Sequence, residues 1–335
     1  MTIKNTKWVL KNRPEGLVKD SDFKLVTEIM PEIQEDEILI ENLFLSFDPT
    51  QRTWLNDMPG YLPPVQIGEV VRSGGMGRVL ESNNPEYKVG DLAFGFVGWQ
   101  SHCITKPTGD ERFRVIPDIL PIPTMLNVMG TTGITAYYGL VELGNPQPGE
   151  TVLVSGAAGA TGSVAVQIAK FKGCHVIGIA GGEEKCAWLK ELGVDDVIDY
   201  KNSNVAEELP KLAKNGIDIY FDNVGGDILE TVLFCININA RILLCGGISS
   251  GYDANRLPAG PRNLFSLIIK RATMQGFLVL DYIPQSQKAL EEIATWVMEG
   301  KLQHREDVQE GIENCPQTLN RLFTGENKGK QLLKI

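Results

Sequence analysis

Three glycines follow a short apolar stretch near the middle of the chain, and their spacing points to phosphate chemistry. Gly156, Gly159 and Gly162 follow Thr151–Ser155, a short run built around Val and Leu. Beyond these glycines, apolar residues recur with a helical period. Glycines let the backbone approach a ligand, and a helix N-terminus offers free N–H groups to a pyrophosphate. The spacing is a variant of the dinucleotide fingerprint, so it predicts a dinucleotide site, although glycines at this spacing also occur in tight packing.

The residues after the next expected strand bear on which dinucleotide is bound. An acidic residue at the end of that strand usually binds the ribose 2′-OH of NAD, but here the strand ends at Gly181 and Gly182. Glu183 or Glu184 could take the ribose role, or both could simply favour the start of a surface helix. Lys185 can pair with a 2′-phosphate. Together these residues favour NADPH.

Two other arrangements of reactive residues predict no site. Gly247–Gly251 matches the G-x-S-x-G hydrolase motif, but that motif must run directly into a helix, and a loop is expected here. The cysteines are scattered, as are His102, His175 and His304, so no set of metal ligands is predicted. His175 lies on an expected strand, and its side chain is expected to pack in the protein core.

Alternating strand-like and helix-like stretches must position the glycine turn. They begin near residue 124 and predict a parallel sheet covered by helices on both faces. The residues before Pro117–Pro123 are typical of a β-rich domain, and that proline-rich stretch is the expected boundary. The fold class is therefore α/β. Strands are expected at 151–155, 175–180, 196–199, 217–222, 241–245 and 273–279. The expected helices include 126–143 and 284–299, and a strand–helix–strand pattern is expected after residue 300.

Composition narrows the class of protein. A length of 335 residues suits two domains, and a net charge of −10 without a long basic run argues against nucleic acid as the main partner. No apolar run of about 18 residues predicts a membrane span. The sequence shows no secretory signal, and its six cysteines form no disulfide pattern, so a cytoplasmic protein is expected.

Beyond the glycine turn, motifs over nearly the whole chain resemble one family, the zinc-independent medium-chain dehydrogenase/reductases. The resemblance is to the branch that holds prostaglandin reductases, alkenal double-bond reductases and bacterial curcumin reductases. The motifs that carry it are LSFDPTQR (Leu45–Arg52), PPVQIGEV (Pro63–Val70), ITAYYGL (Ile134–Leu140), YFDNVGG (Tyr220–Gly226), CGGISSGY (Cys245–Tyr252) and TGENKGKQLLKI (Thr324–Ile335).

This resemblance implies a fold and a cofactor. Residues 1–123 would form a GroES-like catalytic domain, residues 124–300 a Rossmann domain that binds NADPH, and residues 301–335 would return to the first domain. The residues expected at the cofactor are Gly159, Ala160, Thr161 and Gly162 at the pyrophosphate, Lys185 and Tyr200 at the 2′-phosphate, and Asn223, Cys245, Phe277, Leu278, Val279 and Asn327 along the adenosine, ribose and nicotinamide.

The resemblance also implies a reaction, the reduction of the C=C bond of α,β-unsaturated ketones or aldehydes. Hydride would reach the β-carbon, and Tyr252 would lie beside the substrate carbonyl as a proton donor or an orienting group. The alternative to this catalytic role is a structural one, in which the Tyr252 ring only anchors a mobile loop. Ser46–Pro49 and Ile67–Glu69 stand where zinc-dependent members carry cysteine and histidine, so no zinc is expected. Gly251–Pro261 is expected to act as a lid over a hydrophobic substrate.

Two other functions remain open at this stage. One is a quinone reductase with the same fold and cofactor, and the other is a nucleotide-binding protein without turnover. A homodimer is expected mainly from the resemblance, and Thr273–Leu280 is a plausible edge strand for it. The other predicted partner is a small hydrophobic enone or enal, with neither nucleic acid nor membrane.

Overall fold

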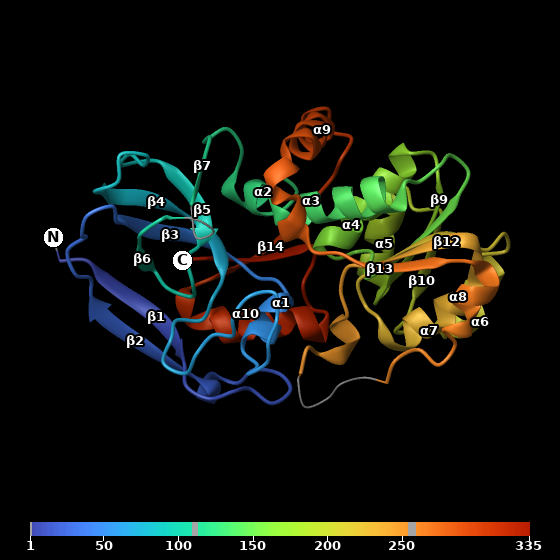
Figure 1. The fold of residues 1–335 in the computed structure, drawn as a ribbon, viewed down its shortest axis with the longest axis horizontal. Coiled ribbons are helices and arrows are strands. Elements are labelled where there is room, and N and C mark those ends of the chain that lie inside the picture. The colour runs from blue at the N-terminus through green and yellow to red at the C-terminus, as the bar shows by residue number, and fades with distance from the viewer. Residues whose placement is uncertain (1, 109–112, 254–258) are drawn as a thin grey trace.

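Two bodies lie side by side in the computed structural model, which describes residues 2–108, 113–253 and 259–335 (Figure 1). The first body is β-rich, and the second is a parallel sheet with helices on both faces. The predicted fold class is thereby confirmed. The predicted domain limits at residues 123 and 300 stay a prediction. Within the described ranges, no helix is long and apolar enough to cross a bilayer.

Six parallel strands form the sheet of the second body. Their order is β10-β9-β8-β11-β12-β13. The chain starts at the central strand β8, adds β9 and β10 on one side, and then returns to the middle to add β11, β12 and β13 on the other side. This is the strand order of a dinucleotide-binding Rossmann sheet. The strands are β8 (Thr151–Ser155), β9 (His175–Ala180), β10 (Asp196–Asp199), β11 (Ile217–Asp222), β12 (Ile236–Leu244) and β13 (Thr273–Gly276).

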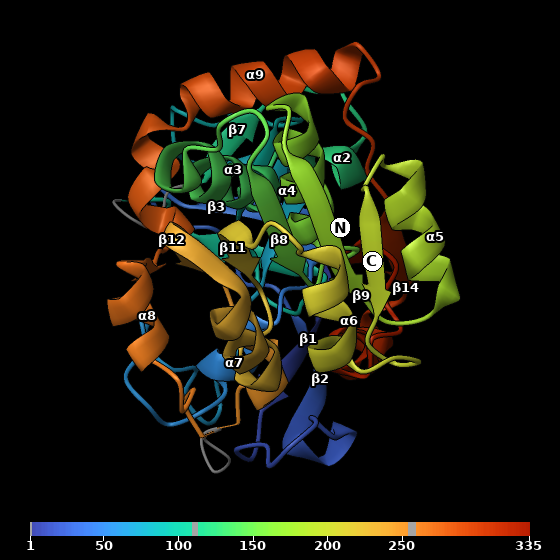
Figure 2. The same cartoon turned by 90° about the vertical axis from the view of Figure 1, so that its right-hand side faces the viewer.

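Alternation along β8 explains how both faces of this sheet are buried. Val152 and Val154 pack in one apolar core, whereas Leu153 packs in the core on the other face. The first core is covered by α3 (Thr131–Tyr137), the π-helical Tyr138–Gly144, α4 (Ala160–Phe171), α5 (Glu183–Glu191) and α9 (Gln287–Met298). The second is covered by α6 (Val205–Leu212), α7 (Gly226–Cys235) and α8 (Phe265–Lys270). Figure 2 shows α9 across one end of this layered body and α7 toward the other.

The β-rich body contains a seven-stranded sheet and a two-stranded one. The larger sheet has the order β14-β15-β3-β4-β5-β7, with β6 also paired to β3, and β1 pairs with β2. Its strands are β1 (Lys4–Leu10), β2 (Phe23–Ile29), β3 (Ile38–Ser46), β4 (Gly74–Ser82), β5 (Leu92–Phe96), β6 (His102–Thr105), β7 (Arg114–Ile116), β14 (Glu306–Glu310) and β15 (Lys330–Lys334). The helices of this part are α1 (Thr50–Trp54), α2 (Ile122–Leu126) and α10 (Cys315–Thr324).

The last strand of the chain, β15, lies in the sheet of the first body. It pairs antiparallel with β3, so that Leu332 lies opposite Ser46. On the way there the chain passes the glycine turn of the second body, where Gly329 forms an isolated bridge with Gly159. The C-terminal segment therefore contacts both bodies.

Several element boundaries differ from the sequence-based expectation. The single helix expected over 126–143 is interrupted, because the chain turns between Leu126 and Gly130 before α3 begins. The last long helix begins at Gln287 rather than Pro284, since Pro284 belongs to a preceding 3₁₀ turn. Strand β12 begins at Ile236, five residues before its expected start.

Candidate cofactor and substrate site

The glycine turn after β8 is built for close approach by a ligand. Gly156 has φ +59°, a conformation that favours glycine. A β-carbon on Gly162 would lie 2.3 Å from the Gly156 carbonyl oxygen, so only glycine lets α4 pack this tightly on the turn. Gly159 precedes α4, and no side chain caps the helix. The first N–H groups of α4, at Ala160 and Thr161, thus stand at an uncapped helix start of the kind that binds phosphate.

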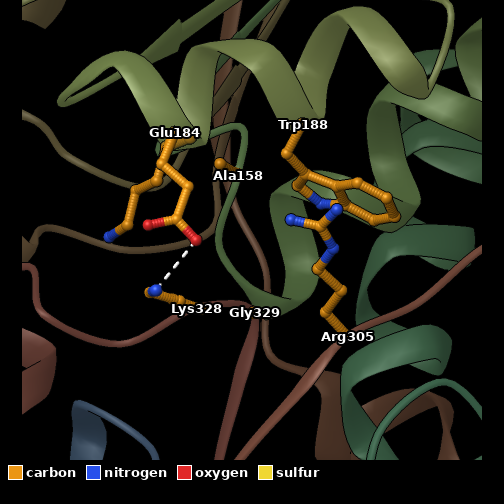
Figure 3. Close-up of a pocket in the computed structure, with 7 residues that line it drawn as sticks. Ala158, Glu184, Trp188, Arg305, Lys328 and Gly329 are labelled. Carbon is orange, nitrogen blue, oxygen red and sulfur yellow. Dashed lines mark ion pairs between the residues drawn. The ribbon is translucent and has the colours of Figure 1, made fainter.

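The C-terminal segment forms the outer wall of a pocket beside this turn. Figure 3 shows Glu184 and Lys328 pointing toward one another across the pocket, which Ala158 and Gly329 also line. The Lys328 Nζ lies 2.8 Å from Glu184 Oε1. Glu184, one of the two carboxylates that sequence alone left open for the ribose, is therefore paired with a lysine in this structure.

Donor groups for a 2′-phosphate converge next to this pocket. A β-carbon built on Gly325 would lie 3.9 Å from the Tyr200 hydroxyl and 4.0 Å from the Nζ atoms of both Lys185 and Lys201. Lys185 Nζ donates to the Gly325 carbonyl at 2.9 Å. Burial lowers the pKa of Lys185, and the Lys201 ammonium lowers it further. Two cations and a phenol around one point form a site suited to a dianion.

The Tyr200 ring packs so closely on Gly181 that the acidic residue usual at this strand end has no room for its side chain. A β-carbon on Gly181 would lie 2.7 Å from the Tyr200 ring, so a larger side chain would displace that ring. Sequence reasoning found Lys185 and Tyr200 but missed Lys201. The available signal was a second lysine directly after Tyr200 in the chain.

The predicted ribose and nicotinamide residues follow neighbouring strands at one edge of the sheet. Asn223 follows β11, and its side-chain amide donates to the Ser155 carbonyl at 2.7 Å. Cys245 follows β12, and its backbone N–H donates to the Asp222 carbonyl at 2.9 Å. Burial raises the pKa of the Cys245 thiol to about 12, so it remains a neutral thiol at physiological pH. The carboxyl edge of a parallel sheet is where dinucleotides bind.

Asp222 fixes the turn that carries Asn223. It is fully buried, and its Oδ1 accepts hydrogen bonds from the hydroxyls of Ser155 and Tyr220 and from the N–H groups of Val224 and Gly225. These four donors satisfy one carboxylate oxygen and hold the backbone in place. Asp222 is thus a positioning residue that the sequence analysis did not single out.

The remaining predicted cofactor residues lie on two separate segments. Phe277 follows β13 with Leu278 and Val279, and its ring packs edge-on against Phe221 at 6.1 Å. Asn327 belongs to the C-terminal segment, where it is buried and donates to the Gly329 carbonyl at 3.0 Å.

Tyr252 lies just beyond β12 with a strained backbone and an available hydroxyl proton. Its φ is +51°, in the left-handed region that non-glycine residues rarely adopt. The phenol oxygen accepts a hydrogen bond from the Gly247 N–H at 2.8 Å. Burial raises the pKa of Tyr252 to about 12, against the lowering effect of that hydrogen bond. The phenol is therefore protonated at neutral pH and can donate its proton to a substrate oxygen.

The first body supplies partners to Tyr252. The Asn56 side-chain amide, just after α1, donates to the Tyr252 carbonyl at 2.8 Å. The phenol of Tyr61 also raises the pKa of Tyr252. Tyr61 packs edge-on against Trp54 at 6.4 Å and hydrogen-bonds the Thr50 hydroxyl. Sequence analysis missed Tyr61, although a tyrosine inside a proline- and glycine-rich loop is a detectable signal.

The expected lid, residues 251–261, cannot be followed as a whole, because residues 254–258 lie outside the described ranges. The hydrolase-like motif is followed by a turn and not by a helix, because Ile248–Ser250 is a single 3₁₀ turn that ends at Gly251 with φ +63°. This geometry differs from a nucleophile elbow.

Metal-ligating side chains do not gather anywhere in the described part of the chain, where no group of three or more His, Cys, Asp or Glu could hold an ion. The expectation that His175 packs in the core is wrong. Its side chain is 41% exposed at the start of β9, with its Nε2 3.1 Å from Asp196 Oδ2 and its Nδ1 3.7 Å from Asp195 Oδ2. The carboxylates of Asp195 and Asp196, beside the start of this inner strand, keep the imidazole at the surface.

Known proteins share this sequence and this fold. Residues 6–113 match the family described as the N-terminal domain of oxidoreductase, and residues 160–295 match the family described as zinc-binding dehydrogenase. NADPH-dependent curcumin reductase from Escherichia coli K12 is 40% identical, over 99% of this chain and 97% of that protein. The NADP(+)-dependent 2-alkenal reductase of Nicotiana tabacum is 38% identical, over 99% of this chain and 98% of that protein.

A solved structure is similar along nearly the whole length. CurA from Vibrio vulnificus in complex with NADPH superposes with a TM-score of 0.92 at 39% identity, covering 98% of each chain.

Proposed function

This chain belongs to the medium-chain dehydrogenase/reductase family, and on that premise we propose its reaction. It is an NADPH-dependent oxidoreductase that reduces the C=C bond of α,β-unsaturated ketones and aldehydes. The observation that carries the proposal is the placement of the Tyr252 phenol beyond β12, at the carboxyl edge of the Rossmann sheet, where its oxygen accepts a hydrogen bond from the Gly247 N–H at 2.8 Å.

The residues at that edge suit NADPH. The uncapped start of α4 and its glycines fit a pyrophosphate, and the cluster of Lys185, Tyr200 and Lys201 fits a 2′-phosphate. Asn223 and Asn327 offer amide groups to the ribose and nicotinamide. When bound, the cofactor supplies a hydride to the substrate β-carbon.

Tyr252 stabilises the charge that this transfer creates. Negative charge develops on the carbonyl oxygen of the resulting enolate, and a fixed hydroxyl donor there stabilises it more than it stabilises the substrate. The Gly247 N–H holds the phenol oxygen at 2.8 Å and leaves the hydroxyl hydrogen for the substrate. Tyr252 or water then supplies the α-proton. Tyr61 and Trp54 provide aromatic surface beside this point for an apolar substrate.

We also propose that the reaction needs no metal and that the enzyme works as a cytoplasmic homodimer. By the family resemblance, Ser46–Pro49 and Ile67–Glu69 stand where zinc-dependent members carry cysteine and histidine, which supports the first point. The support for the dimer is an exposed apolar surface on α8 beside the edge strand β13.

Product identity after reaction with a phenyl-butenone tests the proposal. A saturated ketone, identified by mass and NMR, is the expected product, and the yield should be the same after treatment with EDTA. An allylic alcohol would refute the proposal. NADPH consumption with enals and enones but not with quinones separates this enzyme from a quinone reductase, and no consumption with any of them would indicate a protein without turnover.

A further inference from the structure

A second cavity lies away from the cofactor edge and carries an arginine that has no acidic partner among the residues the structure describes. It encloses about 160 Å³ and shares no lining residue with the predicted cofactor and catalytic positions. Its walls come from β4, β5, β7, α2, the chain before α3, and α9. Figures 1 and 2 both show β7, α2 and α9 in the same part of the molecule. The lining residues are Met76, Phe94, Arg114, Ile116, Pro117, Met125, Met129, Gly130 and Leu290.

Among the described residues that line this cavity, Arg114 carries the only charge. Its guanidinium carbon lies 5.1 Å from the centre of the Phe94 ring, and this cation–π contact orients the head group. Within residues 2–108, 113–253 and 259–335, its side chain makes no ion pair or hydrogen bond. Burial lowers the pKa of Arg114, and in the described part of the chain no carboxylate offsets that effect. A half-buried guanidinium with unused donors binds an anion favourably.

The other walls decide which anion fits. Three methionines, Phe94, Ile116 and Leu290 make an apolar body, and methionine side chains adapt to ligands of varied shape. A phosphate dianion would leave a charge uncompensated against these walls, whereas a monocarboxylate matches the single arginine in charge and in its two-oxygen geometry. The volume resembles that of apolar cavities that accept one benzene ring.

We propose that this cavity is a second binding site, one that takes a small monocarboxylate with an apolar body of about six carbons. The carboxylate pairs with Arg114, and the apolar body lies among Met76, Met125 and Met129. Such an acid could be a free metabolite or the acidic end of a substrate that also reaches the active site. Binding that is independent of substrate identifies the first source.

Methyl NMR of the full chain labelled at methionine tests the proposal with hexanoate as the probe. The chain has eight methionines, of which three line the cavity, and four of the others, Met30, Met58, Met274 and Met298, serve as internal controls. Hexanoate should shift Met76, Met125 and Met129 saturably, also with NADPH present, and leave Met30, Met58, Met274 and Met298 in place. Absence of a saturable shift at the three cavity methyls would overturn the proposal.

Variants separate the charge from the cavity. Arg114→Met should weaken hexanoate by about tenfold or more, the usual effect of losing a hydrogen-bonded charge, while binding of hexanol stays unchanged. Arg114→Lys should retain part of the hexanoate affinity. Leu290→Phe, which narrows the cavity, should weaken both ligands. Equal hexanoate affinity in wild type and Arg114→Met would contradict the assignment. Displacement of hexanoate by a phenyl-butenone would show that the cavity is continuous with the substrate path, which identifies the second source.

Discussion

At the scale of single residues, the cluster of Lys185, Tyr200 and Lys201, which we propose binds the 2′-phosphate, is the best-defined feature of the proposed cofactor site. Lys185 is tied to the Gly325 carbonyl, and Lys201 lies close enough to lower the pKa of Lys185. A cofactor phosphate offers both ammonium groups a stronger partner than a neutral carbonyl does. Cofactor binding should therefore be sensitive to both lysines.

Replacing either lysine should affect NADPH alone. Lys185→Ala should raise the Michaelis constant for NADPH and scarcely change that for NADH, because NADH lacks the phosphate. Lys201→Ala should act in the same direction with a smaller effect, since Lys201 is exposed to solvent and screened by it. Lys172→Ala, a lysine at the far end of α4, is a matched control. Steady-state kinetics with both cofactors measures these effects, and equal changes for NADPH and NADH would contradict the assignment.

The proposed role of Tyr252 predicts how its removal changes turnover and how turnover depends on pH. Tyr252→Phe should lower kcat for enone reduction by about 10²–10³, the usual loss for the main donor to an oxyanion, with little change in the Michaelis constant for NADPH. The protonated phenol is the active form, and its pKa is raised to about 12, so the donor persists below that pH. In wild type, kcat should stay level as pH rises through 10, where an ordinary tyrosine ionises. A loss of kcat centred near pH 10 would speak against this role.

At the scale of elements, β8 and α4 were predictable because their signals are local. Apolar residues in a row, glycines at fixed spacing and a helical period all lie within Thr151–Phe171. The break between α2 and α3 was not predictable in this way. There Gly130 packs directly on its own preceding turn, where a β-carbon would lie 2.8 Å from the Met125 carbonyl oxygen.

The same contrast applies to the site residues. Lys185 was predicted from its place after the second strand of the glycine-turn unit, and Tyr200 from the family resemblance; the structure places the two side chains near one point, and their role at the cofactor stays a prediction. Lys201 and Tyr61 act through contacts with distant segments, and Asp222 joins its own turn to Ser155 on a neighbouring strand, which periodicity and spacing cannot reveal. The strained backbone of Tyr252 is likewise a property of the folded turn and its support from Asn56.

Packing of α4 on the glycine turn gives a stability prediction. In a helix, alanine is more favourable than glycine by about 1 kcal/mol. At Gly162, however, the new methyl group would meet the Gly156 carbonyl oxygen at 2.3 Å and the Ala157 Cα at 2.8 Å. Gly162→Ala should therefore destabilise the fold by about 1–3 kcal/mol and lower Tm. Gly74→Ala, with nothing within 4 Å of the new atom, is the control. Calorimetry in which both variants melt like wild type would refute this packing argument.

At the scale of the whole molecule, the C-terminal segment joins the two bodies at the cofactor site. Strand β15 is fixed in the first sheet through β3, and Gly329 just before it bridges to Gly159 on the second body. Asn327, Lys328 and Gly325 all belong to this short segment, and each contributes a contact at the cofactor edge. The segment thus ties the position of the first body to the glycine turn.

Assembly is the other property of the whole molecule. Strand β13 is the outer strand of the six-stranded sheet, and it pairs with β12 on one side only. Helix α8, which packs beside β12, exposes Phe265 and Ile268 by 67% and 70%. An unpaired strand edge next to exposed apolar side chains favours contact with a second copy. Burial of this surface is the physical basis of the proposed homodimer.

A charge on α8 should break that dimer. Ile268→Glu would place a carboxylate in the interface, where burial without a partner is unfavourable, so the variant should be a monomer at micromolar concentration, where wild type is a dimer. Met298→Glu alters an equally exposed apolar residue, 74% accessible, at the end of α9 and should leave the dimer intact. Light scattering coupled to size-exclusion chromatography distinguishes the two states. If wild type is itself a monomer, the proposed dimer is wrong; if Met298→Glu dissociates it while Ile268→Glu does not, the interface involves α9 in place of the β13 edge.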